Sequence, residues 1–125
     1  MRYVIDPNDI EPIQLVGREM RRLITSDTVG AKALSVGVIS VPPGEAVLPC
    51  HSHNAEEALY IVKGEGQYWI EGETGAFKAR EILWYPPNSR HMIKNTGEKE
   101  LVGVFIFSPP THPDDYVLYE DIRFD

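Results

Sequence analysis

The chain has 125 residues, which is enough for one domain with a modest hydrophobic core but too few for a second catalytic domain. Apolar residues make up 42% and charged residues 25%, a balance that excludes wholesale disorder. The formal net charge of −7 and the scattered basic residues exclude nucleic acid as a partner, because phosphate backbones would be repelled.

Residues 1–32 are predicted to form an N-terminal arm ahead of the domain core. Residues 6–15 carry two prolines and no sustained periodicity, whereas residues 17–24 are compatible with a strand. The densest basic stretch of the chain lies in this strand and is interpreted as a solvated face: Arg18, Arg21 and Arg22.

Features that direct a chain to a membrane or out of the cell are not found in the sequence. No run of 18 apolar residues occurs, and the N-terminus lacks a basic segment followed by an apolar stretch. The single cysteine, Cys50, agrees with a reducing compartment and is interpreted as a small buried residue. We therefore expect no membrane partner and a cytoplasmic location.

Short segments rich in β-branched and aromatic residues follow, separated by turn signals such as Pro-Pro-Gly and Pro-Pro-Asn. None is long enough for a stable helix. The predicted strands span residues 33–41, 57–63, 67–71, 81–85, 90–95 and 101–107. The pattern predicts an all-β sandwich or barrel with its core at about 33–108, and a tail over 109–125 that holds one helical turn or a short strand.

Several predicted strands are apolar on both faces. Leu59 and Ile61 share one side of the strand at 57–63, while Ala58, Tyr60 and Val62 share the other. A strand of this kind needs a cover over its outer face, supplied either by the N-terminal arm or by a second subunit. We favour a homodimer.

Three of the four histidines fall at the ends of turn-bounded strands near a glutamate. His51 and His53 are two apart, so both imidazoles leave the same face of a strand. Glu57 begins the next strand and would return opposite them in a hairpin, and His91 follows a later turn. An H-x-H pair alone is more often a polar surface pair, but three imidazoles and one carboxylate suit a first-row divalent ion.

The spacings resemble the two motifs of the cupin superfamily. The first is Gly44-x6-His51-x-His53-x3-Glu57-x6-Gly64, and the second is Pro86-x-Asn88-x2-His91-x3-Asn95. The resemblance implies a single cupin domain over 1–125, with a double-stranded β-helix, or jelly-roll, barrel. It also implies that one divalent transition metal is bound by His51, His53, Glu57 and His91.

The sequence departs from the cupin pattern at loop positions. Six residues separate Gly44 from His51 where the family usually has five, and Arg80 and Asn88 stand where the family has glycine. Asn88 tolerates the left-handed conformation that glycine would supply. Glu56 is an alternative carboxylate ligand, but only Glu57 leaves six residues before the next glycine of the motif. None of these departures touches an expected ligand.

With four protein ligands, a six-coordinate ion keeps about two positions for water or substrate. Iron or manganese is favoured as the metal, and zinc, nickel or cobalt is possible. Because imidazole must be neutral to bind a metal, we expect occupancy to fall below about pH 6.

Strand parity predicts a mainly apolar wall around the ion. Leu59 and Ile61 lie on the side of Glu57, and Ile93 lies on the side of His91. Either Tyr68 or Trp69, and either Trp84 or Tyr85, should add aromatic surface. The polar candidates for holding a substrate are Gln67, Tyr60 and Arg90.

An open ion in a small apolar pocket is typical of chemistry that the metal itself performs. We predict a metal-dependent enzyme, with dioxygenase-type oxidation of a small organic substrate first and isomerase or lyase chemistry second. Some small cupin lyases use a tyrosine two residues after the ligand glutamate as base, and Leu59 stands there. The sequence assigns no catalytic base. The alternative is a non-catalytic cupin that binds or senses a small sugar or carboxylate.

Overall fold

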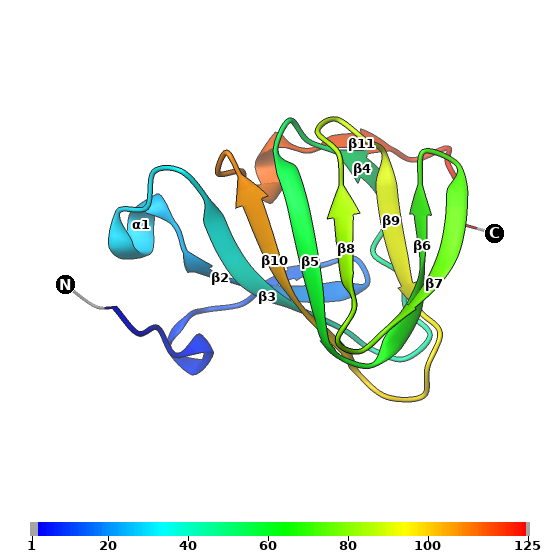
Figure 1. The fold of residues 1–125 in the computed structure, drawn as a ribbon, viewed down its shortest axis with the longest axis horizontal. Coiled ribbons are helices and arrows are strands. Elements are labelled where there is room, and N and C mark those ends of the chain that lie inside the picture. The colour runs from blue at the N-terminus through cyan, green and yellow to red at the C-terminus, as the bar shows by residue number, and fades with distance from the viewer. Residues whose placement is uncertain (1–2, 125) are drawn as a thin grey trace.

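The computed structural model describes residues 3–124, which form two antiparallel sheets that share one hydrophobic core (Figure 1). The larger sheet has the order β1 (Ile13–Leu15), β2 (Arg18–Ile24), β3 (Ser35–Val41), β10 (Leu101–Ser108), β5 (Glu56–Lys63) and β8 (Ile82–Tyr85). The smaller sheet has the order β11 (Val117–Tyr119), β4 (Cys50–Ser52), β9 (His91–Asn95), β6 (Glu65–Ile70) and β7 (Glu73–Lys78). The predicted all-β class is confirmed.

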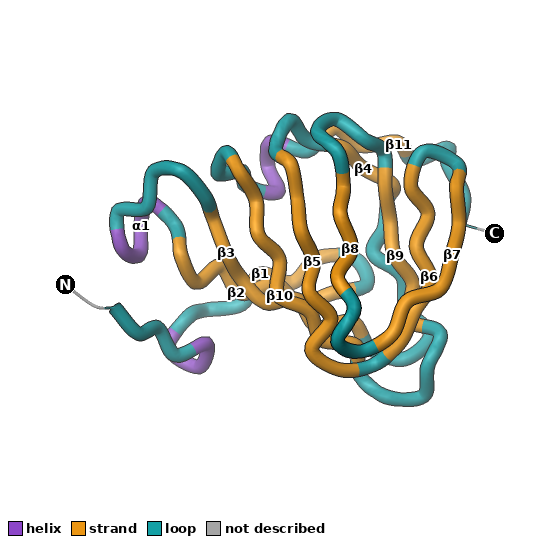
Figure 2. Tube along the Cα trace, in the orientation of Figure 1, coloured by secondary structure: helices purple, strands orange, loops and turns teal. Residues whose placement is uncertain are grey.

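In the part of the chain that the structure describes, three short helices lie outside the sheets and are drawn in purple in Figure 2: η1 (Pro7–Asp9), α1 (Ser26–Val29) and η2 (Pro113–Asp115). Both η1 and η2 are 3-10 helices, and each begins with a proline. The tail therefore holds a helical turn, η2, and a short strand, β11. Within residues 3–124 no helix is long and apolar enough to cross a membrane.

All six predicted strands of the core are present, with ends shifted by one or two residues. The strand expected over 17–24 is β2, which adds to the edge of the larger sheet by pairing with β3. The prediction missed β7, because its sequence is largely polar and among its residues only Phe77 is fully buried. An edge strand with one inward apolar side chain carries too little periodicity to be recognised.

Alternation along β10 shows how the strands build the core. Leu101, Phe105 and Phe107 are buried, whereas Val104 and Ile106 between them are half-buried on the outer face. Burying a phenylalanine side chain contributes roughly 1.5–3 kcal/mol, so the inward face supplies the driving force for packing. The outer face is apolar but stays partly open to solvent.

Left-handed backbone occurs where the sequence departs from the cupin pattern. Arg80 has φ 76° and Asn88 has φ 64°, so both adopt the conformation that glycine adopts most readily. Gly64, which connects β5 to β6, has φ 94°, and a Cβ there would lie 2.8 Å from the Cα of Leu101. Loop shape is thus kept at Arg80 and Asn88 at the cost of some strain, and Gly64 allows no side chain.

Candidate metal centre

The structure brings the four expected ligands together inside the barrel. His51 lies in β4, His53 follows that strand directly, Glu57 is in β5 and His91 begins β9. All four are buried, with exposed fractions of 3–7%. One ring nitrogen from each histidine lies within 4.8 Å of the others, and His51 pairs with His91 in the sheet. The backbone ladder therefore sets the spacing of two of the imidazoles.

Glu57 reaches the histidines by a route different from the predicted hairpin. Strands β4 and β5 belong to different sheets, because the chain crosses from one to the other between residues 52 and 56. The carboxylate consequently approaches His53 and His91 across the barrel interior. A hairpin turn within one sheet and a crossover between two sheets can have the same length and composition. Residue spacing alone therefore could not distinguish the two connections.

Backbone carbonyls hold all three imidazoles in one tautomer. The Nδ1 atoms of His51, His53 and His91 lie 3.1, 2.9 and 2.9 Å from the carbonyl oxygens of Pro49, Ala55 and Ser89 respectively. Since a carbonyl only accepts, each Nδ1 carries the proton and donates it. Each Nε2 is then left with a free lone pair, which is how metal-binding histidines are usually oriented.

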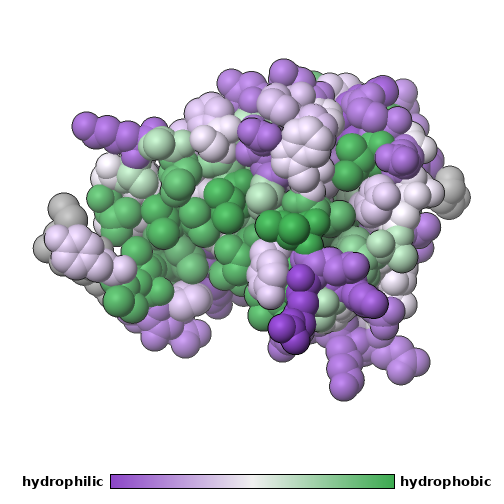
Figure 3. Space-filling model, in the orientation of Figure 1, coloured by the Kyte–Doolittle hydropathy of each residue, from purple (hydrophilic) through white to green (hydrophobic). Residues whose placement is uncertain are grey.

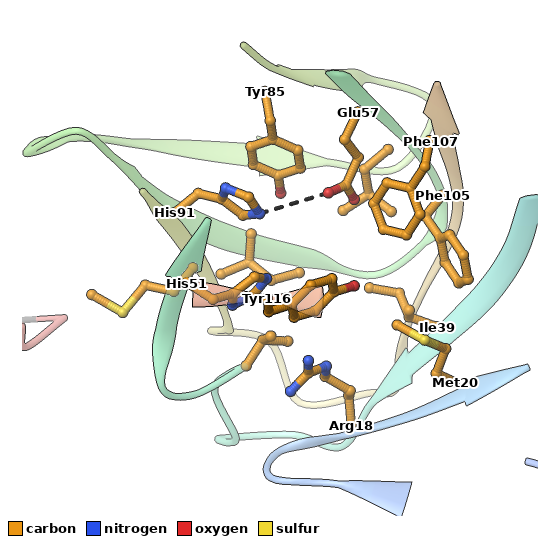
Figure 4. Close-up of a pocket in the computed structure, with 14 residues that line it drawn as sticks. Arg18, Met20, Ile39, His51, Glu57, Tyr85, His91, Phe105, Phe107 and Tyr116 are labelled. Carbon is orange, nitrogen blue, oxygen red and sulfur yellow. Dashed lines mark ion pairs between the residues drawn. The ribbon is translucent and has the colours of Figure 1, made fainter. Parts of the chain in front are cut away.

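Two of the three Nε2 atoms lie near a carboxylate oxygen rather than a hydrogen-bond donor. The Nε2 atom of His53 is 3.1 Å from Oε1 of Glu57. The Nε2 atom of His91 is 3.6 Å from the same oxygen (Figure 4). Within residues 3–124, the buried Nε2 of His91 has no hydrogen-bond partner. Acceptors that face one another in a buried site need a cation between them, so this donor set fits a divalent transition metal.

Burial controls the charges of these groups. Desolvation lowers the pKa of His51 to about 3 and that of His91 well below its ordinary value, so both imidazoles are neutral at physiological pH. Desolvation raises the pKa of Glu57, and the neighbouring His53 acts in the opposite direction. Neutral imidazoles are the form that binds a metal.

Aromatic rings fix the imidazoles from outside. The ring of Tyr116 stacks on His51 at a centroid distance of 4.6 Å and an angle of 6°, and Tyr85 stacks on His91 at 4.2 Å and 22°. Phe107 meets His53 edge-on at 4.9 Å. These contacts restrict ring rotation and keep water from the back of the site.

A cavity of about 30 Å³ adjoins His51, His91 and Glu57. Its wall is mainly apolar and includes Leu59 and Ile93, as strand parity predicted. Tyr85 adds the aromatic surface, while Trp84 points outward and is 59% exposed. The cavity has room for a few atoms of a ligand beside an ion.

Comparison with known proteins identifies the family. The family model of the cupin domain matches residues 37–107. This chain belongs to the cupin family. It is 35% identical over 106 residues to the polyketide synthase protein CurC of Streptomyces cyaneus, a match that covers 85% of this chain and 69% of that protein.

Two further relatives are more distant from this cupin. The 5-nitrosalicylic acid 1,2-dioxygenase of a Bradyrhizobium species is 36% identical over 67 residues, which cover 54% of this chain and 32% of that protein. The crystal structure of a predicted oxalate decarboxylase from Thermotoga maritima superimposes with a TM-score of 0.74 at 26% identity, covering 84% of this chain and 97% of that chain. The jelly-roll architecture expected from the motifs is confirmed.

The three polar candidates for holding a substrate lie away from the cavity of this cupin. Tyr60 is 39% exposed on the outer face of β5, and Gln67 alternates with the inward-facing Gly66 and Tyr68 along β6. Arg90 forms a surface ion pair with Glu71 at 2.8 Å. None of the three lines the cavity. In β5 and β6 the inward parity belongs to the neighbouring residues, and Arg90 lies just before β9 begins.

Arg18 corrects the interpretation of the basic stretch as a solvated face. It is only 8% exposed and lines the cavity, because it shares the inward face of β2 with Met20. The available signal was that Arg18 shares its strand parity with apolar Met20, but an arginine at an inward position is rare. Tyr116 was also missed, since it lies in the irregular tail, where no periodicity marks an inward residue.

Cys50 is buried, as predicted, and desolvation raises its pKa to about 11. Its thiol therefore stays protonated and unreactive at neutral pH.

Proposed function

We propose that this cupin is a metal-dependent enzyme that oxidises a small organic substrate, with iron or manganese held by His51, His53, Glu57 and His91. The observation that carries the proposal is the buried Nε2 of His91, which faces a carboxylate oxygen and has no hydrogen-bond partner among the described residues. Leaving such groups buried costs about 1–3 kcal/mol each, and a bound cation removes that cost.

A bound divalent ion supplies Lewis-acid or redox chemistry at its open positions. The residues around it orient the imidazoles and exclude water. Desolvation raises the pKa values of Tyr85 and Tyr116, so both phenols are neutral and poor proton acceptors near pH 7. A cavity without a group tuned for proton transfer favours reactions that the metal performs.

The relatives support this class of reaction without fixing the substrate. The Bradyrhizobium relative is named as a dioxygenase, and the protein CurC is named for polyketide synthesis. The Thermotoga maritima structure is named as a predicted decarboxylase, which keeps isomerase or lyase chemistry as the second possibility. A dioxygenase should consume oxygen with its substrate and lose activity when zinc replaces iron, whereas an isomerase or lyase should work without oxygen.

Elemental analysis tests the proposal directly. Protein purified without added metal should contain about one iron or manganese per chain, and the His51→Ala, His53→Ala double variant should be folded and metal-poor. Near-stoichiometric zinc or nickel would shift the proposal to Lewis-acid chemistry. Unchanged metal content in the double variant would refute the assigned site.

The alternative is a non-catalytic cupin that binds or senses a small sugar or carboxylate. A relative from Thermotoga maritima that is named as an oxalate-binding protein, 32% identical over 84 residues, supports this alternative. Absence of metal from both the wild type and the double variant, together with a ligand that binds and is recovered unchanged, would support this alternative over the enzyme.

We also propose that the chain forms a homodimer through the outer face of the larger sheet. Two apolar rows cross β3, β10, β5 and β8 on this face. The rows consist of Val38, Val104, Tyr60 and Ile82, and of Val36, Ile106, Ala58 and Trp84. Figure 3 shows the apolar surface that they help to form. The N-terminal strands extend the sheet at its edge, so a second copy is the proposed cover. A cytoplasmic location stays a prediction.

A further inference from the structure

Arg18 is a buried cation at the wall of the metal cavity. It is 8% exposed, and it lines the cavity together with His51 and Glu57. Figure 4 shows its guanidinium pointing toward His51 and Tyr116. Burial lowers the pKa of Arg18. Guanidinium is nevertheless so weak an acid that the group stays charged at neutral pH.

The contacts of Arg18 position it without neutralising it. Its Nη1 atom donates to the carbonyl oxygens of Val16 and Leu48, at 3.2 and 3.4 Å. Among residues 3–124, no carboxylate forms an ion pair with it, since Glu57 is directed at His53 and His91. Buried charges in proteins are normally paired, because removing an ion from water is costly. The guanidinium therefore has charge and donors available for an anion.

Arg18 also stands at the boundary between the cavity and the surface. A second hollow of about 160 Å³ lies beside the cavity, with apolar walls that include Val16 and Leu118. Arg18, His51 and Tyr116 line both spaces. A ligand in either space therefore lies beside both the guanidinium and His51.

We propose that Arg18 binds the carboxylate group of a small organic acid and holds it beside the metal centre. The planar fork of guanidinium matches a carboxylate and forms shorter, stronger hydrogen bonds than a neutral donor forms. The small inner cavity limits the part of the acid next to the ion to a few atoms. This proposal rests on the proposed function, because it names the substrate class of the same site.

Calorimetric titration with oxalate tests the inference, and neutral oxamide of the same shape serves as the control ligand. Arg18→Gln is compared with the wild type and with Arg21→Gln. Arg21 lies on the same strand, outside the cavity lining, and bonds to Glu19 and to backbone carbonyls of the arm. Each protein is titrated metal-loaded and metal-free, with metal content measured afterwards and folding checked by thermal unfolding.

Arg18→Gln should bind oxalate roughly ten- to a hundredfold more weakly than the wild type, with oxamide binding and metal content unchanged. Arg21→Gln should match the wild type. Arg18→Lys keeps the charge but not the planar fork, so its loss of oxalate affinity should be smaller. If Arg18→Gln does not fold, Arg18→Lys takes its place in the comparison with the wild type.

Equal oxalate binding by the wild type and the Arg18 variants, including no binding by any of them, would overturn the inference and leave the metal proposal intact. A wild type that holds no metal would instead overturn the proposed function. In that case the metal-free titrations still decide for or against the anion site at Arg18.

Discussion

The Nε2 atom of His53 and the Oε1 atom of Glu57 lie 3.1 Å apart in the interior of the barrel. The Nδ1 proton of His53 is given to the carbonyl of Ala55, so two acceptors face each other unless a proton or a metal ion lies between them. Burial raises the pKa of Glu57, which shows that the ionised carboxylate is unfavourable there without a cation. The site therefore lowers the stability of the metal-free protein, and the same arrangement provides its metal affinity.

Replacing Glu57 by glutamine should separate these two effects. The amide can donate to an imidazole, so the metal-free Glu57→Gln protein should be more stable by about 1 kcal/mol, whereas metal affinity should fall at least tenfold. Thermal unfolding and metal content after dialysis measure the two quantities. Glu56→Gln is the matched control, because Glu56 is exposed and bonds to the indole of Trp84. Loss of metal in the control alone would transfer the ligand role to Glu56.

The metal-free protein should lose stability as the pH falls below 6.5. The folded-state pKa of His51 is about 3, so between pH 6.5 and 3 the unfolded chain binds a proton that the folded chain does not. His91 acts in the same direction, and Glu57, with its raised pKa, acts in the opposite direction. Each histidine should remove up to roughly 1.4 kcal/mol of unfolding free energy per pH unit.

Urea unfolding of the metal-free protein at pH 7, 6 and 5 measures this slope. His51→Gln, which cannot be protonated, should show a shallower slope than the wild type. The same lowered pKa values move the expected loss of metal below the pH of about 6 inferred from ordinary imidazoles, because protons compete weakly for these nitrogens. A wild-type stability that is flat over this range would contradict the prediction.

Asn95 should matter for stability and not for metal binding. Its side chain is fully buried and donates to the carbonyls of Val41 and Lys99, and its oxygen accepts from the amide of Gly97. Asn95→Ala leaves these backbone groups unpaired and should cost about 2–4 kcal/mol in denaturant unfolding. Exposed Asn54 offers a control, whose alanine variant should stay within about 0.5 kcal/mol of the wild type. Loss of metal from folded Asn95→Ala would assign it a role in the site.

A charge on the outer face of the larger sheet should prevent dimer formation. Ile82 is 60% exposed and lies beside Tyr60 across the sheet, so Ile82→Glu would place a carboxylate in the proposed interface. Light scattering should give the mass of two chains for the wild type and of one 14.1 kDa chain for the variant. Glu81→Gln, next to it in the chain, should leave the mass unchanged. A monomeric wild type would remove the homodimer proposal.

Much of the ligand set could be predicted from the sequence, because its members are close together along the chain. His51, His53 and Glu57 fall within one short segment. Strand parity correctly placed Leu59 and Ile93 at the cavity wall, whereas Ile61, predicted beside Leu59, is buried in the core and does not line the cavity. Period-two alternation is a property of each strand alone, so it can be read without knowing which strands pair. The same reasoning could not show that β4 and β5 lie in different sheets, since that depends on where the chain crosses.

The sequence by itself determined an all-β cupin domain and the residues able to hold a metal, because strand periodicity and motif spacing are local properties of the chain. Only the tertiary structure decided what surrounds them. It buried Arg18 from the N-terminal region and stacked Tyr116 from the tail on His51, and it left Tyr60 and Arg90 outside. Burial and electrostatic environment arise from contacts between distant segments, and no local pattern encodes which segments meet.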